Sequence, residues 1–303
     1  MENKPLVSFW IPVYNQEKYV RECLESALAQ TYSPLEIVIS DDCSKDRSFE
    51  IIKDIVSKYK GPHKIIVNRN SVNLGIGGQQ NKKRELVHGE FITSCAGDDI
   101  AMPNKAEVLV EKWLQSGKKT HLLFTNAIII DENGNEGDLL FRNIPRYSST
   151  LDDFVTDKRS RLSKMLEPSV WVHGATSGTS REIFESFDEI NPKVMQEDAV
   201  ISFRALLLGG MEYVDMPLVK YRVHSGSVSS NTNYKSVARL LSKEHYYVEQ
   251  QMADANKVGT STRVMCELKK NLIVANSKKW VFNMPYLNTM IIALIKRLNK
   301  SRK

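Results

Sequence analysis

The sequence predicts an α/β protein with a mostly parallel central sheet, helices on both faces of the sheet and a helical C-terminal extension. Two observations lead to this prediction. Short apolar runs rich in β-branched residues alternate with stretches of helical periodicity over the first 130 residues, which is the pattern of parallel strand–helix units. Beyond about residue 230 the pattern is helical only, and it becomes steadily more basic.

Apolar periodicity places the elements of the first half. Strands are expected at residues 6–13, 35–40, 64–67, 91–94 and 121–130. Helices are expected at about 19–28, 49–56, 79–87 and 104–117. Asn15 and Asp46 are predicted to cap the first two helices, and Asn133-Gly134 is predicted to form a turn after the fifth strand.

The second half is less regular. Residues 142–170 are polar and irregular, and we expect a mobile connection there. Order returns after Trp171, with a helix that ends near Phe187, a helix that opens at Gln196 and a strand at 211–219.

The composition is that of a globular protein with a full core, since 42% of the 303 residues are apolar. The four cysteines are scattered without a C-x-x-C pair, so we expect reduced thiols. The N-terminal apolar run is broken by Pro12 and does not resemble a signal peptide. The longest late apolar run, at 290–295, is too short to span a bilayer. These features predict a cytoplasmic protein.

Charge is distributed unevenly along the chain. Residues 257–303 contain eleven Lys and Arg against one Glu, a charge of +10, so the +6 of the whole chain leaves −4 for residues 1–256. An acidic body argues against a nucleic-acid-binding protein, whereas the basic tail favours a peripheral position at an anionic membrane surface. A helix packed on the domain, or a contact in an oligomer, is the alternative for this tail.

The stretch from Ser94 to Pro103 is the centre of the functional prediction. Asp98 and Asp99 follow a probable strand, and open α/β sheets bind ligands at the carboxyl ends of their strands. Adjacent carboxylates suit a divalent metal, which would hold a diphosphate in turn. The alternative is a solvated turn whose Asp caps the next helix.

A nicotinamide-binding Rossmann domain is discounted. Its G-x-G-x-x-G motif should follow the first strand, where this chain has Pro12-Val-Tyr-Asn15. The glycines at 75, 77 and 78 follow the third strand instead and have a different spacing.

Seven short motifs occur in a characteristic order over roughly residues 5–230. They are a strand into P-V-Y-N, then I-V-I-S-D-D-C-S-K-D, N-L-G-I-G-G-Q-Q-N, G-E-F-I, G-D-D-I-A-M-P, Q-E-D and Y-R-V-H-S-G-S-V-S. This series resembles the family 2 glycosyltransferases of the bacterial polysaccharide type, which have the Rossmann-like GT-A fold. The resemblance implies a GT-A domain at 1–230, with a nucleotide-binding half (1–130) and an acceptor-binding half (131–230), followed by a basic helical extension at 231–303.

The resemblance also implies roles in binding a nucleotide-sugar. Pro12, Tyr14 and Asn15 would lie against the nucleotide base. Asp41 and Asp42 would accept hydrogen bonds from that base; the alternative is that they only cap the following helix. Gly75 would let the backbone approach the donor. Asn81, Asp98 and Arg222 complete the donor-binding set, with Asp98 at the ribose or at the metal and Arg222 facing phosphate or pairing with carboxylates.

A metal and a catalytic base are implied in the same way. Asp98, Asp99 and His224 would hold Mn²⁺ or Mg²⁺, although His224 could equally be a loop histidine. Asp198 would be the catalytic base, with Glu197 as its orienting neighbour, because an acceptor hydroxyl must lose its proton as it attacks. A charged first helical turn is the alternative for that pair.

The activity implied is inverting, metal-dependent transfer from a nucleotide-sugar, with a UDP-sugar favoured, to a hydroxyl of a saccharide or lipid-linked saccharide in surface polysaccharide synthesis. Two departures weaken the match: Ala96 and Gln80 stand where the family often has Asp and Arg, although Lys82 or Lys83 could supply the lost cation. An inactive nucleotide-sugar-binding scaffold is therefore the main alternative. A sugar nucleotidyltransferase fits less well, because the chain lacks a Gly-rich N-terminal loop.

Overall fold

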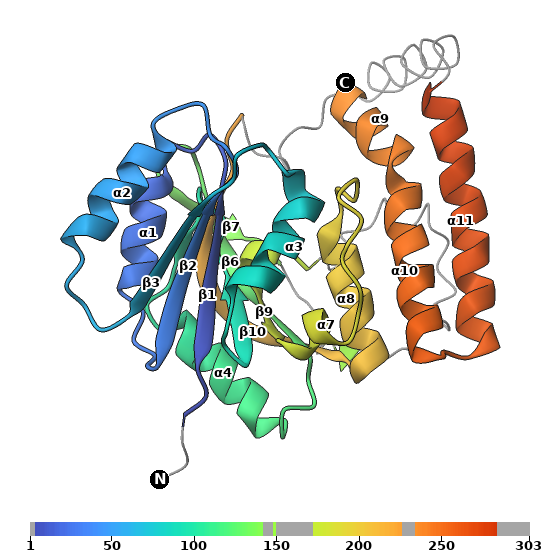
Figure 1. The fold of residues 1–303 in the computed structure, drawn as a ribbon, viewed down its shortest axis with the longest axis horizontal. Helices are drawn as coiled ribbons and strands as arrows, with labels where there is room; N and C mark the ends of the chain where they lie inside the picture. The colour runs from blue at the N-terminus through green and yellow to red at the C-terminus, as the bar shows by residue number, and fades with distance from the viewer. Residues whose placement is uncertain (1–3, 142–147, 150–171, 226–233, 284–303) are drawn as a thin grey trace.

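A computed structural model describes residues 4–141, 148–149, 172–225 and 234–283. Its centre is a ten-stranded sheet. Eight of the strands follow the order β3-β2-β1-β4-β9-β6-β10-β5, and the other two, β7 and β8, pair with β6 and β10, respectively. Figure 1 shows helices on both faces of this sheet and a further group of helices, from the C-terminal part of the chain, beyond one of those faces. The predicted α/β class is confirmed.

The first half of the chain forms the parallel part of the sheet, in which β2 and β4 flank β1 and β3 lies beyond β2. The strands are β1 (Val7–Val13), β2 (Leu35–Asp41), β3 (Lys64–Arg69) and β4 (Phe91–Ser94). The helices are α1 (Val20–Leu28), α2 (Ser48–Lys58), α3 (Gly75–Leu86) and α4 (Lys105–Gln115). The inner strands read as nearly unbroken apolar runs because helices cover both of their faces.

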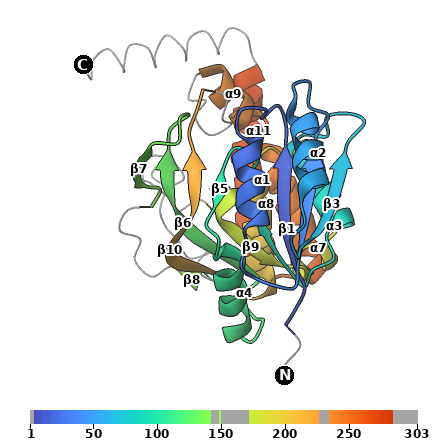
Figure 2. The same cartoon turned by 90° about the vertical axis from the view of Figure 1, so that its left-hand side faces the viewer.

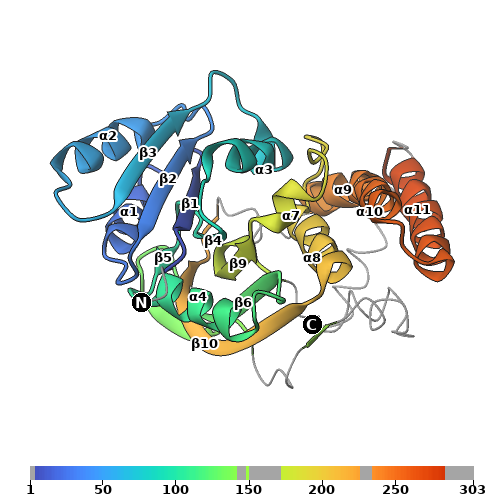
Figure 3. The ribbon, with the colours of Figure 1, turned by 60° about the horizontal axis from the view of Figure 1, so that its bottom comes forward.

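The rest of the sheet adds antiparallel strands between and around a second parallel pair, β6 and β10. Its strands are β5 (Ile100–Ala101), β6 (Leu122–Ile130), β7 (Glu136–Leu139), β8 (Ser148–Ser149), β9 (Ser177–Ser180) and β10 (Met211–Arg222). Antiparallel β9 joins β4 to β6 and so connects the two parallel groups. Figure 3 shows β10 as a long, curved strand, and this curvature brings its far end back toward the first half.

Two apolar cores lie on opposite faces of the sheet. One packs α1, α2 and α4 against the strands. The other packs residues of α8 (Glu197–Leu208) and α7 (Glu182–Glu185), next to the 3₁₀ turn η1 (Gly174–Thr176). Figure 2, which looks onto the α1 side, shows α1 in front of the strands and α8 behind them.

The C-terminal extension comprises α9 (Tyr234–Ser242), α10 (Glu244–Val258) and α11 (Thr262–Asn283). Its α10 is anchored to α8 by a buried ion pair in which Arg204 donates from Nε and Nη2 to Asp254 over 2.8 and 3.0 Å. Phe203 of α8 packs in a small core with residues of α10 and α11. Across the described residues, every helix falls short of the length or the apolar character that crossing a bilayer requires.

Two helix starts differ from the sequence prediction. Asn15 does not cap α1, which begins at Val20: its φ is 54°, and its side-chain oxygen accepts the Lys45 amide over 2.8 Å. Helix α3 begins at Gly75 rather than at 79, because a distant carboxylate, Asp42, accepts its first free amides. Most of the irregular region at 142–170 lies outside the described residues.

Candidate active site

The parallel arrangement brings the carboxyl ends of β1, β2 and β4 to one edge of the sheet. The register pairs Val13 with Asp41 and Trp10 with Ser94. The loops beyond these strands also touch, since the Gly97 amide donates to the Pro12 carbonyl over 3.1 Å. The predicted base-binding and metal-binding segments are therefore neighbours, at the position where open α/β sheets bind ligands.

Asp41 carries an unused acceptor. Its Oδ2 accepts the Ser44 amide over 3.1 Å and lies 3.4 Å from Nε of Arg69. Its Oδ1 is buried and has no hydrogen-bond partner among the described residues. Since buried polar atoms are normally paired, this oxygen can serve an N–H group of a ligand. Beside it, Tyr14 is 46% exposed and available to a flat base.

Asp42, in contrast, is occupied by its own chain. Its Oδ1 accepts the Leu74 amide (2.8 Å) and the Asn70 side chain (2.9 Å), and its Oδ2 accepts the Gly75 amide over 2.9 Å. Gly75 has φ of 69°, and the space beyond its Cα is open. The structure thus uses Asp42 to cap α3 rather than to face a base, while leaving the backbone at Gly75 accessible.

Asn81 and Arg222 also have structural partners in place of the predicted donor contacts. The Asn81 side chain donates to the carbonyl and accepts from the amide of Ile190, each over 2.8 Å, and so holds the segment before α8. Arg222 donates from Nε to the Asp98 carbonyl (2.9 Å) and from Nη1 to the Asp131 carbonyl (3.2 Å), and it pairs with Glu22. It therefore organises the loops around Asp98.

Asp98 and His224 form an accessible pair. His224 Nε2 lies 3.1 Å from Asp98 Oδ2, and the two side chains are 13% and 14% exposed, respectively. The ring of Tyr19 packs 4.7 Å from that of His224. Carboxylate oxygen and imidazole nitrogen are both ordinary ligands of Mn²⁺, so this pair fits part of a metal site.

Asp99 lies inside the protein. It is 1% exposed, its Oδ1 accepts the Arg222 amide over 2.8 Å, and its Oδ2 has no partner among the described residues. Burial raises the pKa of Asp99 well above its usual range, and Cys95 and Asp98 add to the effect. No cluster of three or more His, Cys, Asp or Glu side chains able to hold a metal occurs in the described part of the chain. A metal at Asp98 and His224 would need the oxygens of its substrate, as is usual for Mg²⁺.

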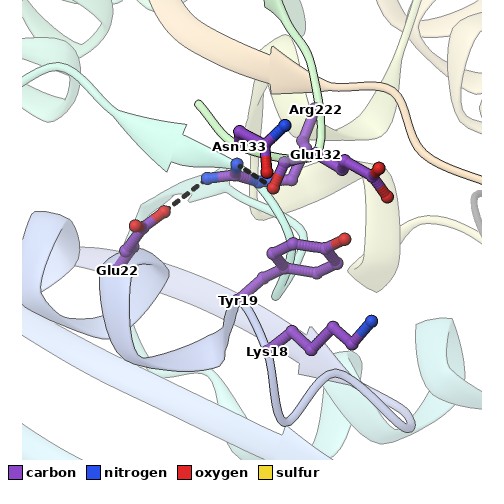
Figure 4. Close-up of a pocket in the computed structure, with 6 residues that line it drawn as sticks. All are labelled: Lys18, Tyr19, Glu22, Glu132, Asn133 and Arg222. Atoms are coloured by element: carbon purple, nitrogen blue, oxygen red, sulfur yellow. Dashed lines mark hydrogen bonds and ion pairs between the residues drawn. The ribbon is translucent and has the colours of Figure 1, made fainter. Parts of the chain in front are cut away.

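A cleft of about 320 Å³ opens beside this pair. It is lined by Lys18, Tyr19, Glu22, Glu132, Asn133 and Arg222. Figure 4 shows the Arg222 side chain crossing it toward Glu22, with the ring of Tyr19 alongside. The guanidinium carbon lies 4.8 Å from the centre of that ring. The lining is polar and carries both signs of charge, which suits a small polar ligand rather than an apolar one.

Glu197 and Asp198 form the first turn of α8, facing η1. A Cβ built on Gly174 would lie 3.2 Å from Oδ1 of Asp198 and 3.8 Å from Oε1 of Glu197, so the glycine leaves room for both carboxylates. Burial raises the pKa of Glu197 to about 7. Burial, and then the charge of Glu197, raises the pKa of Asp198 well above its usual range. Carboxyls with raised pKa values are typical of proton-transfer sites.

Two buried lysines connect these parts: Lys83, which the sequence suggested only as a replacement cation near the diphosphate, and Lys105, which it did not mark. Lys105 donates to the carbonyls of Ser94 and Ala175. Lys83 donates to Oγ of Ser94 over 3.0 Å. Ser94 is four residues before Asp98, and Ala175 follows Gly174. The ammonium of Lys105 therefore holds the loop that carries Asp98 and the turn η1 close together. Lys105, the first residue of α4, gives no sequence signal of such a role.

Comparison with known proteins agrees with this architecture. Residues 8–186 match the profile of Glycosyl transferase family 2. An uncharacterized glycosyltransferase of Methanocaldococcus jannaschii, MJ1057, is 37% identical over 135 residues, covering 44% of this chain and 45% of that protein. Another from Nostoc sp., alr2836, is 27% identical over 286 residues, covering 90% and 82%. With a Rickettsia felis glycosyltransferase the match spans 40% of that protein, so the chain is about half as long as some of these relatives.

Solved structures share the fold. Residues 1–349 of TarS of S. aureus, in complex with UDP-GlcNAc, have a TM-score of 0.53 at 17% identity, covering 90% of this chain and 88% of that one. The mannosyltransferase PcManGT of Pyrobaculum calidifontis, in complex with GDP-Man and Mn²⁺, has a TM-score of 0.57 at 16% identity, covering 98% and 81%. At this identity the likeness concerns the GT-A fold alone. With a family profile matched over more than half of its length, this chain belongs to glycosyltransferase family 2.

Proposed function

We propose that this glycosyltransferase is inverting and metal-dependent, and that it transfers a sugar from a UDP-sugar to a hydroxyl of a saccharide or lipid-linked saccharide in surface polysaccharide synthesis. One observation carries the proposal. Lys105 ties Ser94, which precedes the Asp98–His224 pair, to Ala175. Gly174, next to Ala175, lies against the carboxyls of Glu197 and Asp198, whose pKa values are raised.

The nucleotide is proposed to bind at the edge formed by β1 and β2. The buried Oδ1 of Asp41 would accept the imide N–H of uracil, and Tyr14 would cover the face of the base. TarS, which shares the fold, has been solved with UDP-GlcNAc and with UDP. Because PcManGT was solved with GDP-Man, guanine-containing donors belong in any test.

Asp98 and His224 are the residues proposed to hold Mn²⁺ or Mg²⁺. When bound, the cation supplies positive charge to the departing diphosphate. Asp99 is proposed to position the site through the Arg222 amide, since it is buried. The presence of Mn²⁺ in the PcManGT complex supports a divalent metal in this fold.

Asp198 is proposed as the general base, with Glu197 as its neighbour. Asp198 takes the proton of the acceptor hydroxyl as the hydroxyl oxygen forms its bond to the anomeric carbon. The bond from that carbon to the phosphate oxygen breaks on the opposite side, so the configuration inverts and the nucleoside diphosphate leaves with the bonding electrons. A positioned carboxylate typically contributes about 10²–10⁴-fold to such a step.

The deciding experiment is turnover of a panel of UDP- and GDP-sugars with Mn²⁺ and with saccharide acceptors, followed by NMR of the product's anomeric configuration. We expect turnover with at least one UDP-sugar, inversion at the transferred carbon and loss of rate with EDTA. Binding of UDP without turnover of any pair would instead favour the nucleotide-sugar-binding scaffold. Retention of configuration would contradict the proposed mechanism.

A further inference from the structure

Lys83 is a buried cation on the side of α3 that faces the catalytic carboxyls. Its side chain is 4% exposed, its ammonium donates to Ser94 Oγ over 3.0 Å, and it lies 5.2 Å from the centre of the Phe184 ring. Its immediate neighbour Lys82 pairs instead with Glu85 on the surface. The two adjacent lysines therefore have different environments, and only Lys83 can act on the interior of the site.

The charges around Lys83 explain how an ammonium is tolerated there. Ionised Glu197 and Asp198 favour its charged form, whereas burial and the nearby ammonium of Lys105 oppose it. The balance lowers the pKa of Lys83 to about 8, so the side chain is still mainly protonated at neutral pH. A buried charge needs a counter-charge, and here the carboxyls of α8 provide it.

We propose that Lys83 is a positioning residue for the transfer reaction: its buried ammonium, bound to Ser94, is the counter-charge that favours the ionised form of the Glu197–Asp198 pair, so that Asp198 can accept a proton. The inference rests on the proposed function. In this proposal the charge of Lys83 acts on the catalytic base. It does not replace, at the diphosphate, the arginine that the family often has at position 80.

The packing of α3 on the segment before α8 keeps Lys83 in place. Asn81, two residues earlier, makes both of its hydrogen bonds to Ile190. A Cβ on Gly77 would approach the carbonyl oxygens of Asn191 and Val194 to 2.8 and 3.0 Å, so the helix lies directly against this loop. Among the described residues, the charged group that faces the two carboxyls from a packed element is accordingly Lys83 of α3, whereas Lys105 of α4 acts on Lys83 itself.

The test compares the pH dependence of kcat for Lys83→Met, which keeps the stem but removes the charge, with that of the wild type. An opposite charge nearby shifts a carboxyl pKa by about 1–3 units, so the acid limb should move up by about one pH unit or more. Lys83→Arg should keep the limb near its original position. Lys82→Met, on the exposed side of the same helix, is the matched control and should leave it unchanged.

A second measurement tests the effect of Lys83 on the carboxyls directly, in the folded protein and without catalytic turnover. Carboxyl ¹³C NMR titration of the folded protein should show the Glu197 resonance titrating at higher pH in Lys83→Met, and in Ser94→Ala by a smaller shift. If the wild type transfers no sugar, the proposed function fails but this titration still tests Lys83. Unchanged carboxyl titration in both folded variants would overturn the inference, as would an unmoved acid limb in an active Lys83→Met enzyme.

Discussion

The backbone amide of Arg222 donates a hydrogen bond over 2.8 Å to Oδ1 of Asp99, a residue 123 positions earlier in the chain. This bond joins the end of β10 to the loop after β4. Two residues after Arg222, Nε2 of His224 lies 3.1 Å from Oδ2 of Asp98. Asp98 thus lies beside His224 because its buried neighbour Asp99 fixes the backbone of β10 at Arg222. The two acids have different roles, which separate experiments can distinguish.

Replacement of Asp98 should weaken metal binding directly. We expect Asp98→Asn or His224→Ala to raise the dissociation constant for Mn²⁺, measured with UDP present, by about tenfold or more, since even outer-shell changes cost about 10–100-fold. Asp99→Ala should instead destabilise the fold by about 1–3 kcal/mol, because it leaves the buried Arg222 amide without an acceptor. Loss of Mn²⁺ binding in a folded Asp99→Ala protein, with normal binding by Asp98→Asn, would reverse the assignment.

Asp198→Asn removes the proposed base while keeping the size of the side chain. The turnover number should fall by about 10²–10⁴-fold with little change in the affinity for the donor, because the proton transfer occurs only in the reaction step. Glu189→Gln, an exposed acid in the segment before the same helix, serves as the control and should keep its rate. Full activity of Asp198→Asn in a steady-state assay would remove this residue from the mechanism.

The raised pKa of Glu197 predicts opposite pH trends for activity and stability. Its value changes from 4.5 to about 7 on burial, so the folded chain binds more protons than the unfolded chain between these pH values. The free energy of unfolding should therefore decrease as pH rises through this window, whereas activity should increase as the pair ionises. Urea denaturation at pH 5 and pH 7.5 measures the first trend, and Glu197→Gln should reduce it. An equal decrease in that variant would contradict the cause given.

The buried pair of Arg204 and Asp254 connects α8 to the C-terminal extension. Asp254→Ala leaves the guanidinium buried and without its carboxylate, and should lower the free energy of unfolding by about 3–5 kcal/mol. The exposed pair of Lys257 and Asp188 is a matched comparison, since Lys257→Ala should cost less than about 1 kcal/mol. Similar effects of the two substitutions in chemical denaturation would show that the buried pair is not an anchor.

The described part of α11 presents apolar side chains to solvent among lysines. Ile273 is 68% and Trp280 is 61% exposed, and Lys270 is 73% exposed. Exposed apolar side chains among lysines can contact an anionic membrane, the peripheral position that the sequence predicts. The double substitution Ile273→Ser with Trp280→Ser should lower the fraction of protein floating with phosphatidylserine vesicles. Val72→Ser, at an exposed apolar residue of the nucleotide-binding half, is the control, and equal flotation of all three proteins would reject a contribution of this face. The predicted apolar run at 290–295 lies outside the described residues.

Local pattern was sufficient for the class of the fold and for most of its elements. The four parallel strands of the first half lie where their apolar runs predicted them. The inner strands β1, β2 and β4 are mostly apolar because both of their faces are covered, whereas β3 at the edge is partly exposed. The helix that opens with Glu197 was also expected. The predicted start of α3 was wrong by four residues, because the helix is capped by Asp42, a residue 33 positions before Gly75.

What the sequence determined by itself was the order of strands and helices, the resemblance to a family, and which acids follow which strands. Only the tertiary structure decided how those acids are used: Asp98 is partly exposed beside His224, Asp99 is buried, Asp42 caps α3 and Asp41 has an unused oxygen. The reason is physical. The role of a carboxylate depends on burial and on partners from distant parts of the chain, and neither can be inferred from the residues next to it.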